Sequence, residues 1–293
     1  MRGFWRICSI LLFSLFLVSC SSQTDTTELS SYGDRYIIDI HAHILPTDQE
    51  INDQFIEDLV VEAQGAGVSK IGLFLHVRQE PDRPPTYSED HDIMVLEAYE
   101  SYPDVIIPLL AGFDPADPNA VSYVEEQLKT GKWKGIGELD LRNQVKKTTT
   151  QMNDPTMMEI YNIAAEYDVP IFFHYDSCYE TDCDSGKAEY EEAVAQNPDT
   201  VFITAHRCDE DLMKKYDNLY CEPESLDSIL PDASLLDRVI IGTDVQHTDL
   251  KVQGGKYSYG EYIVAIRENL GSLDSDTQAK IMHETAEEIF HLS

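Results

Sequence analysis

The chain has 293 residues, 42% of them hydrophobic, so it is long enough to bury a large core in one domain or two. Acidic residues outnumber basic ones by 54 to 21, and the formal net charge is −33. This charge repels nucleic-acid backbones and anionic membrane surfaces, so it argues against broad nucleic-acid binding. The expected partner is a small-molecule substrate.

Residues 1–19 have the features of a targeting segment. Two arginines precede an apolar run over residues 7–18, which is shorter than the roughly 20 residues of a membrane-spanning helix. The run ends in Leu17-Val18-Ser19-Cys20, which resembles the lipobox of bacterial lipoproteins. The resemblance implies cleavage before Cys20 and a lipid on Cys20 as the only membrane contact. Simple secretion without lipidation is the alternative.

Residues 20–35 are predominantly polar and indicate a flexible tether to the cell envelope. The serines that follow Cys20 lack the acidic residue that usually retains lipoproteins at the inner membrane. We therefore expect the protein to be located at the outer membrane or its periplasmic face.

Four cysteines remain after the leader and Cys20: Cys178, Cys183, Cys208 and Cys221. An even number in an oxidising compartment permits disulfides. Cys178 and Cys183 are close enough in sequence for a disulfide between them to close one loop. Four free buried thiols are the alternative, because pairing does not follow from spacing alone.

From residue 36 the chain repeats an apolar, β-branched run followed by an amphipathic stretch. Eight runs are predicted strands: 36–43, 70–77, 105–113, 134–141, 169–175, 201–206, 219–222 and 238–244. Helices are predicted at 53–66, 89–101, 119–130, 155–167 and 187–196, and two more, at 259–269 and 277–290, would close the ring.

Strands that alternate with helices indicate parallel βαβ units. Eight such units in residues 36–293 predict an α/β fold, a single closed (β/α)₈ TIM barrel. An open, doubly wound sheet is the alternative, but no glycine-rich phosphate loop follows the first strand.

Six histidines and carboxylates fall at the ends of predicted strands: His41, His43, Glu138, His174, His206 and Asp244. Alternate residues of a strand point to one side, and all strand ends of a barrel converge on one face. Imidazoles and carboxylates suit divalent zinc, with manganese or iron(II) as alternatives, and one or two ions. A bound cation of this kind activates water for hydrolysis. The sequence therefore predicts a metal site in the barrel mouth.

These residues resemble the amidohydrolase superfamily over nearly all of the mature chain. The segment 242–247, Gly-Thr-Asp-Val-Gln-His, is similar to the strand-eight ending of the amidohydrolase 2 branch. Residues 135–138, Gly-Ile-Gly-Glu, are similar to the fourth strand of the TatD-like branch, whose glutamate is a metal ligand. No lysine ends this strand, so the carboxylated-lysine bridge of many relatives is absent.

The resemblance implies one metal held by His41, His43 and Asp244. It implies a second held by His174 and His206, with Glu138 between the two. Asp244 would act as general base, and Asp244 and His206 are the candidate catalytic residues. His283 stands in the last helix where both branches usually have asparagine.

Other polar residues near strand ends are weaker candidates. His76 could touch substrate, His247 could orient a ligand, and four residues could line the pocket: Tyr175, Asp176, Glu222 and Glu224. Asp39 and Asp140 point inward by parity and are expected to support hydrogen bonds rather than bind metal. Three histidines on helical patterns are expected to be structural: His91, His283 and His291.

The predicted function is metal-dependent hydrolysis of a small ester, lactone, amide or phosphoester. The first alternative is an amidohydrolase 2 type decarboxylase, for which Arg78 or Arg207 could bind the substrate carboxylate. The second is a non-catalytic surface lipoprotein that keeps the barrel as a binding module.

Overall fold

The computed structural model describes residues 33–44, 53–75, 87–178, 182–223, 232–246, 250–252 and 255–292. Parallel strands pair with one another in the order in which they occur in the chain. They are β1 (Ile37–Ile44), β2 (Val68–Leu75), β3 (Ile106–Leu110), β4 (Gly135–Asn143), β6 (Ile171–Tyr175), β7 (Phe202–Thr204) and β8 (Leu219–Cys221). The predicted strand positions are therefore confirmed for the first seven units, with ends that differ by up to three residues.

An extended segment, residues 239–244, closes the sheet in place of a regular eighth strand. Its Val239 forms a parallel bridge with Cys221 of β8. The Ile240 N–H donates to the Cys221 carbonyl at 3.0 Å, and the Ile40 N–H of β1 donates to the Ile241 carbonyl at 3.0 Å. The strand predicted at 238–244 is thus wrong as a regular strand. The segment nevertheless joins both edges of the sheet, and the TIM-barrel fold is confirmed.

In the described residues, four short strands add to this ring. β5 (Thr148–Thr149) forms an antiparallel hairpin with the end of β4. β9 (Val245–Gln246) extends the closing segment and pairs in parallel with β1. β10 (Lys251–Val252) and β11 (Tyr257–Ser258) are antiparallel additions beside β9.

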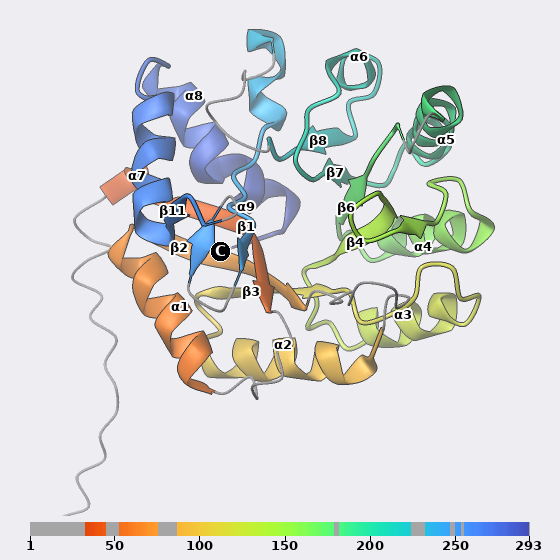
Figure 1. The fold of residues 1–293 in the computed structure, drawn as a ribbon, viewed down its shortest axis with the longest axis horizontal. Coiled ribbons are helices and arrows are strands. Elements are labelled where there is room, and N and C mark those ends of the chain that lie inside the picture. The colour runs from red at the N-terminus through yellow and green to blue at the C-terminus, as the bar shows by residue number, and fades with distance from the viewer. Residues whose placement is uncertain are drawn as a thin grey trace, which may run out of the picture.

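Helices follow one another around the strands, as Figure 1 shows. They are α1 (Asp53–Gly65), α2 (Glu89–Ser101), α3 (Ala120–Leu128), α4 (Pro155–Glu166), α5 (Cys183–Gln196), the short α6 (Glu210–Met213) and α7 (Tyr259–Leu270). The 3₁₀ turn η3 (Ala233–Arg238) leads into the closing segment, and η2 (Gly33–Arg35) precedes β1. α7 packs beside α1 and completes the ring, as predicted.

Local sequence explains where these helices begin. Ser88 accepts a hydrogen bond from the Asp90 N–H at the start of α2, and Asp154 caps α4 just before a proline at its first position. Ser258 and Glu261 form a reciprocal capping box at the start of α7. Each cap satisfies backbone donors that have no partner within the helix.

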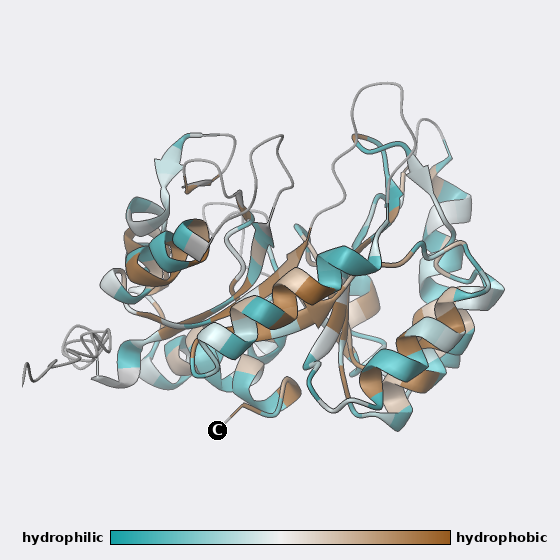
Figure 2. Ribbon diagram, turned by 90° about the horizontal axis from the view of Figure 1, so that it is seen from below, coloured by the Kyte–Doolittle hydropathy of each residue, from teal (hydrophilic) through white to brown (hydrophobic). Residues whose placement is uncertain are grey.

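The last helical stretch begins in the outer ring and ends beneath the barrel. It runs through α8 (Ser275–Ala279), the π-helical η4 (Lys280–Glu284) and α9 (Thr285–Ile289). Its Ala286, Ile289 and Phe290 belong to a buried cluster with interior barrel residues such as Ile38 and Leu109. The expectation that this stretch closes the ring is therefore met only in its first part, where Ile281 and Met282 pack in the outer core, because its last residues fill the lower end of the barrel. Figure 2 shows the C-terminus on that lower side.

Hydrophobic residues concentrate in the strands and on the helix faces that turn toward them (Figure 2). A second, larger buried cluster fills this layer between strands and helices. Two disulfides form, Cys178–Cys183 and Cys208–Cys221. In the part of the chain that the structure describes, no helix is long and apolar enough to span a membrane.

Candidate metal centre

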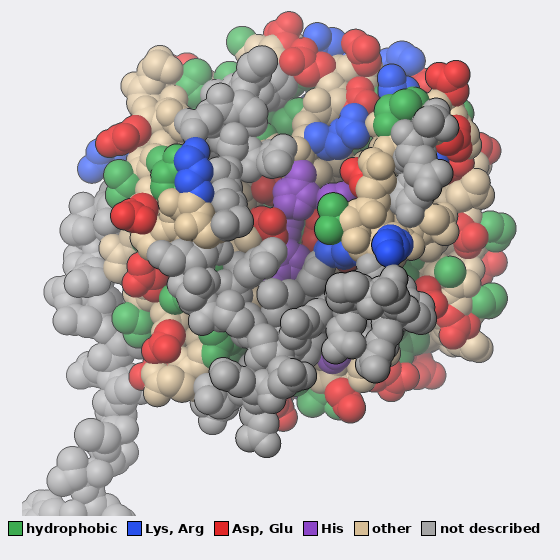
Figure 3. All heavy atoms as spheres, viewed as in Figure 1, with side chains coloured by type: hydrophobic (Ala, Val, Ile, Leu, Met, Phe, Trp, Pro, Cys, Tyr) green, Lys and Arg blue, Asp and Glu red, His purple; other side chains and the backbone are tan. Residues whose placement is uncertain are grey.

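The six side chains predicted to form a site lie together at the C-terminal ends of the strands. They are His41 and His43 of β1, Glu138 of β4, His174 of β6, His206 after β7 and Asp244 before β9. Figure 3 looks onto a hollow in this face, where histidine side chains are visible and both acidic and basic side chains lie around them. Segments about two hundred residues apart in the chain therefore supply one cluster.

The closest contacts join His41, His43 and Asp244. Asp244 Oδ1 lies 2.7 Å from His43 Nε2 and 3.4 Å from His41 Nε2. The two histidine Nε2 atoms are 3.0 Å apart. Both rings are buried, whereas 34% of the Asp244 side chain is exposed. Asp244 is thus the member of this trio that faces the opening.

Glu138 lies between two pairs of histidines. Its Oε2 is 3.6 Å from His41 Nε2 and 3.8 Å from His43 Nε2. Its Oε1 is 3.6 Å from His174 Nδ1 and also 3.6 Å from His206 Nε2. Each of the two Glu138 oxygens therefore faces a different histidine pair. This is the arrangement expected of a ligand between two metal positions.

The spacing of the Glu138 contacts fits a divalent cation better than direct hydrogen bonding. Among the described residues, the buried Glu138 Oε1 has no hydrogen-bond partner, because contacts of 3.6 Å exceed hydrogen-bond distance. Ligand atoms held about 2.0–2.2 Å from one tetrahedral ion lie roughly 3.3–3.6 Å from each other. The six residues therefore suit one or two divalent ions.

Two of the six residues adopt a left-handed backbone. The φ angles are 64° at His206 and 52° at Asp244. For a residue with a Cβ atom this conformation costs about 1–2 kcal/mol. Such strain is typical of functional sites, where the surrounding structure holds it in place.

The carboxylates of the cluster are ionised despite their burial. Burial acts to raise the pKa of Glu138, but the nearby His41 and His174 hold it well below its usual range. For Asp244, burial is outweighed by the His43 hydrogen bond and the charge of His41, which lower its pKa to about 2. Burial opposes the charged form of His41, yet Glu222 and Glu138 raise its pKa well above its usual value. Ionised carboxylates in a buried pocket are the electrostatic setting that a cation requires.

Glu222, one of the weaker pocket candidates from the sequence, contacts the cluster directly. It follows β8 and is buried, and its Oε2 lies 2.9 Å from His41 Nδ1. This contact assigns the His41 proton to Nδ1 and leaves Nε2 available to a metal. Gly242 makes room for it, because a Cβ there would lie 2.5 Å from Glu222 Cγ and 2.7 Å from His41 Cβ.

Asp39 does not point into the mouth, so its predicted orientation is wrong. The pairing of β1 with β2 shifts register between Asp39 and Ala42, which breaks the strict alternation of sides. Asp39 accepts hydrogen bonds from Thr243 Oγ1 at 2.7 Å and from the Tyr259 hydroxyl of α7 at 2.8 Å. The expectation that it supports hydrogen bonds rather than binds metal agrees with these contacts.

Asp140 pairs with His174 across β4 and β6 and lies at the edge of the cluster. Both of its carboxylate oxygens are 2.8 Å from Lys146 Nζ, and Oδ1 also accepts from Asn143 Nδ2 at 2.9 Å. Lys146 lies in the turn between β4 and β5, a hairpin that the sequence pattern did not predict. Sequence reasoning did not single out this lysine, which contacts Asp140 beside the cluster.

The residues after His174 separate into two environments. Asp176 Oδ1 lies 3.4 Å from His174 Nε2, at the mouth. Tyr175 instead packs into the outer core, and its hydroxyl donates to Glu189 of α5 at 2.6 Å. Its proposed place in the pocket is therefore wrong. Arg207 follows His206 and donates to Ser177 Oγ at 3.0 Å.

Several weaker candidates lie outside the described residues: His76, Arg78, Glu224 and His247. His91 lies on α2, away from the cluster. His283 stacks on Tyr36 with ring centroids 4.1 Å apart, and His291 pairs with Asp168 at 3.0 Å. The contacts of these last two are structural, as expected.

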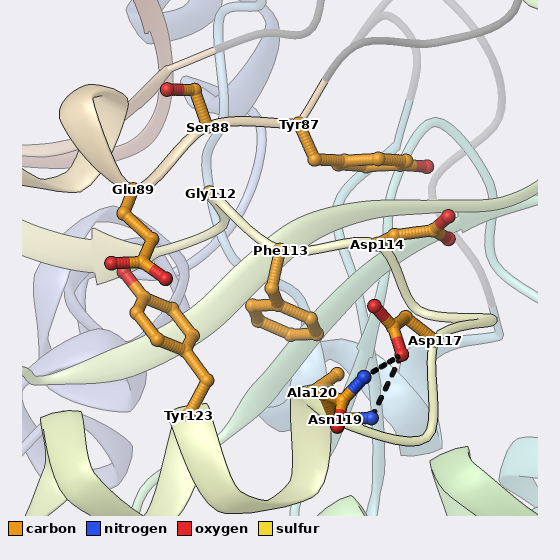
Figure 4. Close-up of a pocket in the computed structure, with 10 residues that line it drawn as sticks. All are labelled: Tyr87, Ser88, Glu89, Gly112, Phe113, Asp114, Asp117, Asn119, Ala120 and Tyr123. Carbon is orange, nitrogen blue, oxygen red and sulfur yellow. Dashed lines mark hydrogen bonds between the residues drawn. The ribbon is translucent and has the colours of Figure 1, made fainter.

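A pocket of about 480 Å³ opens at the C-terminal end of β3, between the starts of α2 and α3. Figure 4 shows Tyr87 and Asp114 extending toward the same side of it. Burial and the charges of Asp114 and Asp140 raise the pKa of Tyr87.

The fold and donor set define an amidohydrolase-type TIM barrel. The chain belongs to the amidohydrolase 2 family, whose profile matches residues 38–292. No curated protein sequence matches the chain.

Solved structures show the same fold at low sequence identity. A 2,6-dihydroxybenzoate decarboxylase from Rhizobium is similar with a TM-score of 0.62 at 12% identity, covering 88% of this chain and 99% of the other. A 5-carboxyvanillate decarboxylase from Novosphingobium aromaticivorans, complexed with manganese and a nitrobenzoic acid, has a TM-score of 0.58 at 13% identity and covers 89% and 97%. A 4-oxalomesaconate hydratase from Rhodopseudomonas palustris has a TM-score of 0.59 at 12% identity and covers 87% and 95%.

Proposed function

We propose that the protein is a metal-dependent enzyme that removes a carboxylate group from a small organic acid as CO₂. The observation that carries the proposal is the cluster of six donors with Arg207 beside it, in a fold shared with decarboxylases of aromatic acids. This favours the lyase alternative over the hydrolysis that the sequence first suggested.

The residues divide into a buried set and an exposed set. The side chains of His41, His43 and Glu138 are at most 3% exposed, which suits holding a cation. Those of Asp244 and His206 are 34% and 24% exposed, so these two face a bound substrate. A divalent cation bound here would supply Lewis acidity that polarises a substrate oxygen.

Decarboxylation replaces a C–COO⁻ bond by a C–H bond and releases CO₂, so the site must deliver one proton to carbon. Asp244 is the candidate carrier: its carboxylate is ionised in the resting site and can take up a proton from a substrate hydroxyl before donating it. His206, on the other side of Glu138, is the second candidate. Arg207 can hold a carboxylate beside them.

The test is product analysis with metal-loaded protein and a panel of hydroxybenzoic acids. We expect CO₂ release with zinc or manganese, and its loss by at least about a hundredfold in Asp244→Asn, because the proton carrier is removed. A panel that yields no CO₂ under any metal loading would contradict the proposal.

Hydrolysis is the second candidate, and the two-sided position of Glu138 favours it. Each Glu138 oxygen faces its own pair of histidines, so the donors suit two ions, a common arrangement in hydrolytic enzymes. The same preparation is therefore assayed with small esters, lactones and phosphoesters. Hydrolysis without CO₂ release would select this function.

We also propose that the enzyme acts as a lipid-anchored protein of the cell envelope. The lipobox-like segment ending at Cys20 and the two disulfides support an extracytoplasmic, oxidising location. Cys20→Ala should move the protein from the membrane fraction to the soluble fraction, and an unchanged distribution would contradict the anchor.

A further inference from the structure

We infer that Asp39 is a positioning residue that holds two candidate metal ligands, His41 and Asp244, in place relative to each other. It acts through the two segments that carry these ligands, and not by touching the metal. The inference rests on the metal dependence in the proposed function and is independent of the reaction that the metal serves. It gives a role to a fully buried carboxylate that lies two residues before the first ligand.

One oxygen of Asp39 is shared by the two segments. Asp39 Oδ1 accepts a hydrogen bond from the His41 N–H at 3.1 Å and another from the Thr243 N–H at 3.0 Å. His41 is itself a candidate ligand, and Thr243 directly precedes Asp244. A single atom therefore joins the backbone of β1 to the backbone of the closing segment, next to a ligand on each side.

The second oxygen of Asp39 anchors this arrangement. Oδ2 accepts from the Thr243 hydroxyl at 2.7 Å and from the hydroxyl of Tyr259, the first residue of α7, at 2.8 Å. Asp39 and Tyr259 are fully buried, and Thr243 is 2% exposed. A carboxylate has about four acceptor sites, so these four hydrogen bonds satisfy both oxygens. A buried network that is fully satisfied is rigid.

The closing segment depends on these bonds because its pairing with β1 is interrupted. The Ile241 carbonyl accepts from β1 at 3.0 Å, and in the described residues the pairing resumes in β9. Asp244 lies in between with a φ angle of 52°, a strained conformation that its surroundings must hold in place. The two hydrogen bonds from Thr243 to Asp39 bridge this interruption. Without them, Asp244 Oδ1 would shift from its position 3.4 Å from His41 Nε2.

A simpler role for Asp39 would be to fasten α7 to the barrel, and the experiment must separate the two roles. Thr243→Val and Tyr259→Phe are a matched pair, because each removes one hydroxyl that donates to the same Asp39 oxygen. Only Thr243→Val breaks a link to the closing segment. Thr243→Ser keeps the hydroxyl, and Asp39→Ala removes all four hydrogen bonds.

Three measurements are made on each purified variant. Titration of the metal-free protein with zinc, in competition with a chromophoric chelator, gives the dissociation constant for zinc. Cobalt(II) then takes the place of zinc, and its visible absorption reports the geometry of the ligands. Denaturant unfolding of the metal-free protein measures stability separately. A merely structural role for Asp39 would change stability without a specific effect on the two metal measurements.

We expect Thr243→Val to weaken zinc binding about tenfold and Asp39→Ala to weaken it about 10- to 100-fold, the usual loss when a residue that orients a metal ligand is removed. Both variants should alter the cobalt absorption. Tyr259→Phe should lose a similar amount of stability to Thr243→Val, since each loses one buried hydrogen bond, but it should keep nearly the wild-type affinity for zinc. Thr243→Ser should restore both metal measurements.

Two results would overturn the inference. The first is a wild-type zinc affinity with an unchanged cobalt absorption in Thr243→Val. The second is equal weakening of zinc binding by Thr243→Val and Tyr259→Phe, which would show that Asp39 only fastens α7. If Asp39→Ala fails to fold, the matched pair decides alone.

The CO₂ assay keeps this inference separate from the proposed function. Zinc binding that depends on the Thr243 hydroxyl, without any CO₂ release, would reject decarboxylation and leave the positioning role intact. CO₂ release by a protein whose zinc affinity and cobalt absorption are unchanged in Thr243→Val would do the reverse.

Discussion

At the scale of single residues, Glu222 fixes the tautomer and the ring orientation of His41, a candidate metal ligand. Its carboxylate oxygen lies 2.9 Å from His41 Nδ1, and the same oxygen is 3.3 Å from the His206 backbone nitrogen. It thereby connects two of the six candidate ligands, one on β1 and one just after β7. Partners of this kind fix the ring orientation and the tautomer of a ligating histidine.

Glu222→Gln keeps the size of the side chain and removes its charge. We expect metal affinity to fall by about 10- to 100-fold, because the proton on His41 is no longer held by an anion. Competition with a chromophoric chelator measures the change. Asp217→Asn is the control, since Asp217 is an exposed acid before the same strand. An affinity equal to that of the control would show that Glu222 only fills space.

The residue scale also shows where sequence reasoning worked and where it did not. The spacing of His41 and His43 correctly placed both rings in the mouth, because this end of β1 keeps its alternation. Asp39, two residues earlier, has the same parity but lies beyond a register shift and binds Thr243 and Tyr259 instead. A register shift depends on the neighbouring strand, so it is invisible in the pattern of one strand.

At the scale of elements, the Cys208–Cys221 disulfide joins the segment after β7 to the end of β8. His206 lies two residues before one cysteine, and Glu222 follows the other. The bond therefore ties together the two short strands that carry these site residues. Apart from this bond, β7 and β8 are held by the backbone hydrogen bonds of strands that are only three residues long each.

Replacing both cysteines, Cys208→Ser with Cys221→Ser, should reduce the free energy of unfolding by about 2–4 kcal/mol, the usual effect of opening such a loop. The double variant Cys178→Ser/Cys183→Ser is the comparison. Its shorter loop predicts a smaller loss, because loop-closure entropy grows with loop length. Denaturant unfolding measures both, and equal or reversed losses would argue against this account.

The last helix is the element whose position the sequence did not predict. Its amphipathic pattern showed that one face must be buried, but a barrel offers two apolar surfaces, the outer layer and the open lower end. Phe290 shows that the end of the helix packs against the lower end of the barrel. It is 1% exposed and belongs to the interior cluster with Ile38 and Leu109. The β4–β5 hairpin with Lys146 was missed for a related reason, since two-residue β5 has no periodicity to detect.

Phe290→Ala should lower the free energy of unfolding by about 3–5 kcal/mol, as expected for a large aromatic side chain removed from a packed interior. His291→Ala is the adjacent control, because 55% of its side chain is exposed and its loss should change stability by no more than about 0.5 kcal/mol. Thermal or denaturant unfolding of the pair gives the comparison. Similar values for both variants would mean that the helix does not fill the barrel.

At the scale of the whole molecule, a cation held by the candidate ligands would cross-link the barrel. They come from β1, β4 and β6 and from the segments after β7 and before β9. The eighth segment, which closes the ring, makes few backbone hydrogen bonds to its neighbours. Asp244 at its end therefore offers a second means of closure, through a cation shared with His41 and His43 of β1.

Removal of the metal should accordingly destabilise the entire barrel rather than one loop. A ligand at about 1,000 times its dissociation constant stabilises the native state by about 4 kcal/mol, which corresponds to roughly 8–16 °C in Tm for a domain of this size. Calorimetric scans with zinc and with excess chelator measure the difference. Asp244→Asn should show a smaller zinc-dependent shift, because it weakens the link between the closing segment and β1. A Tm that is the same with zinc and with chelator would mean that the six side chains do not hold a metal.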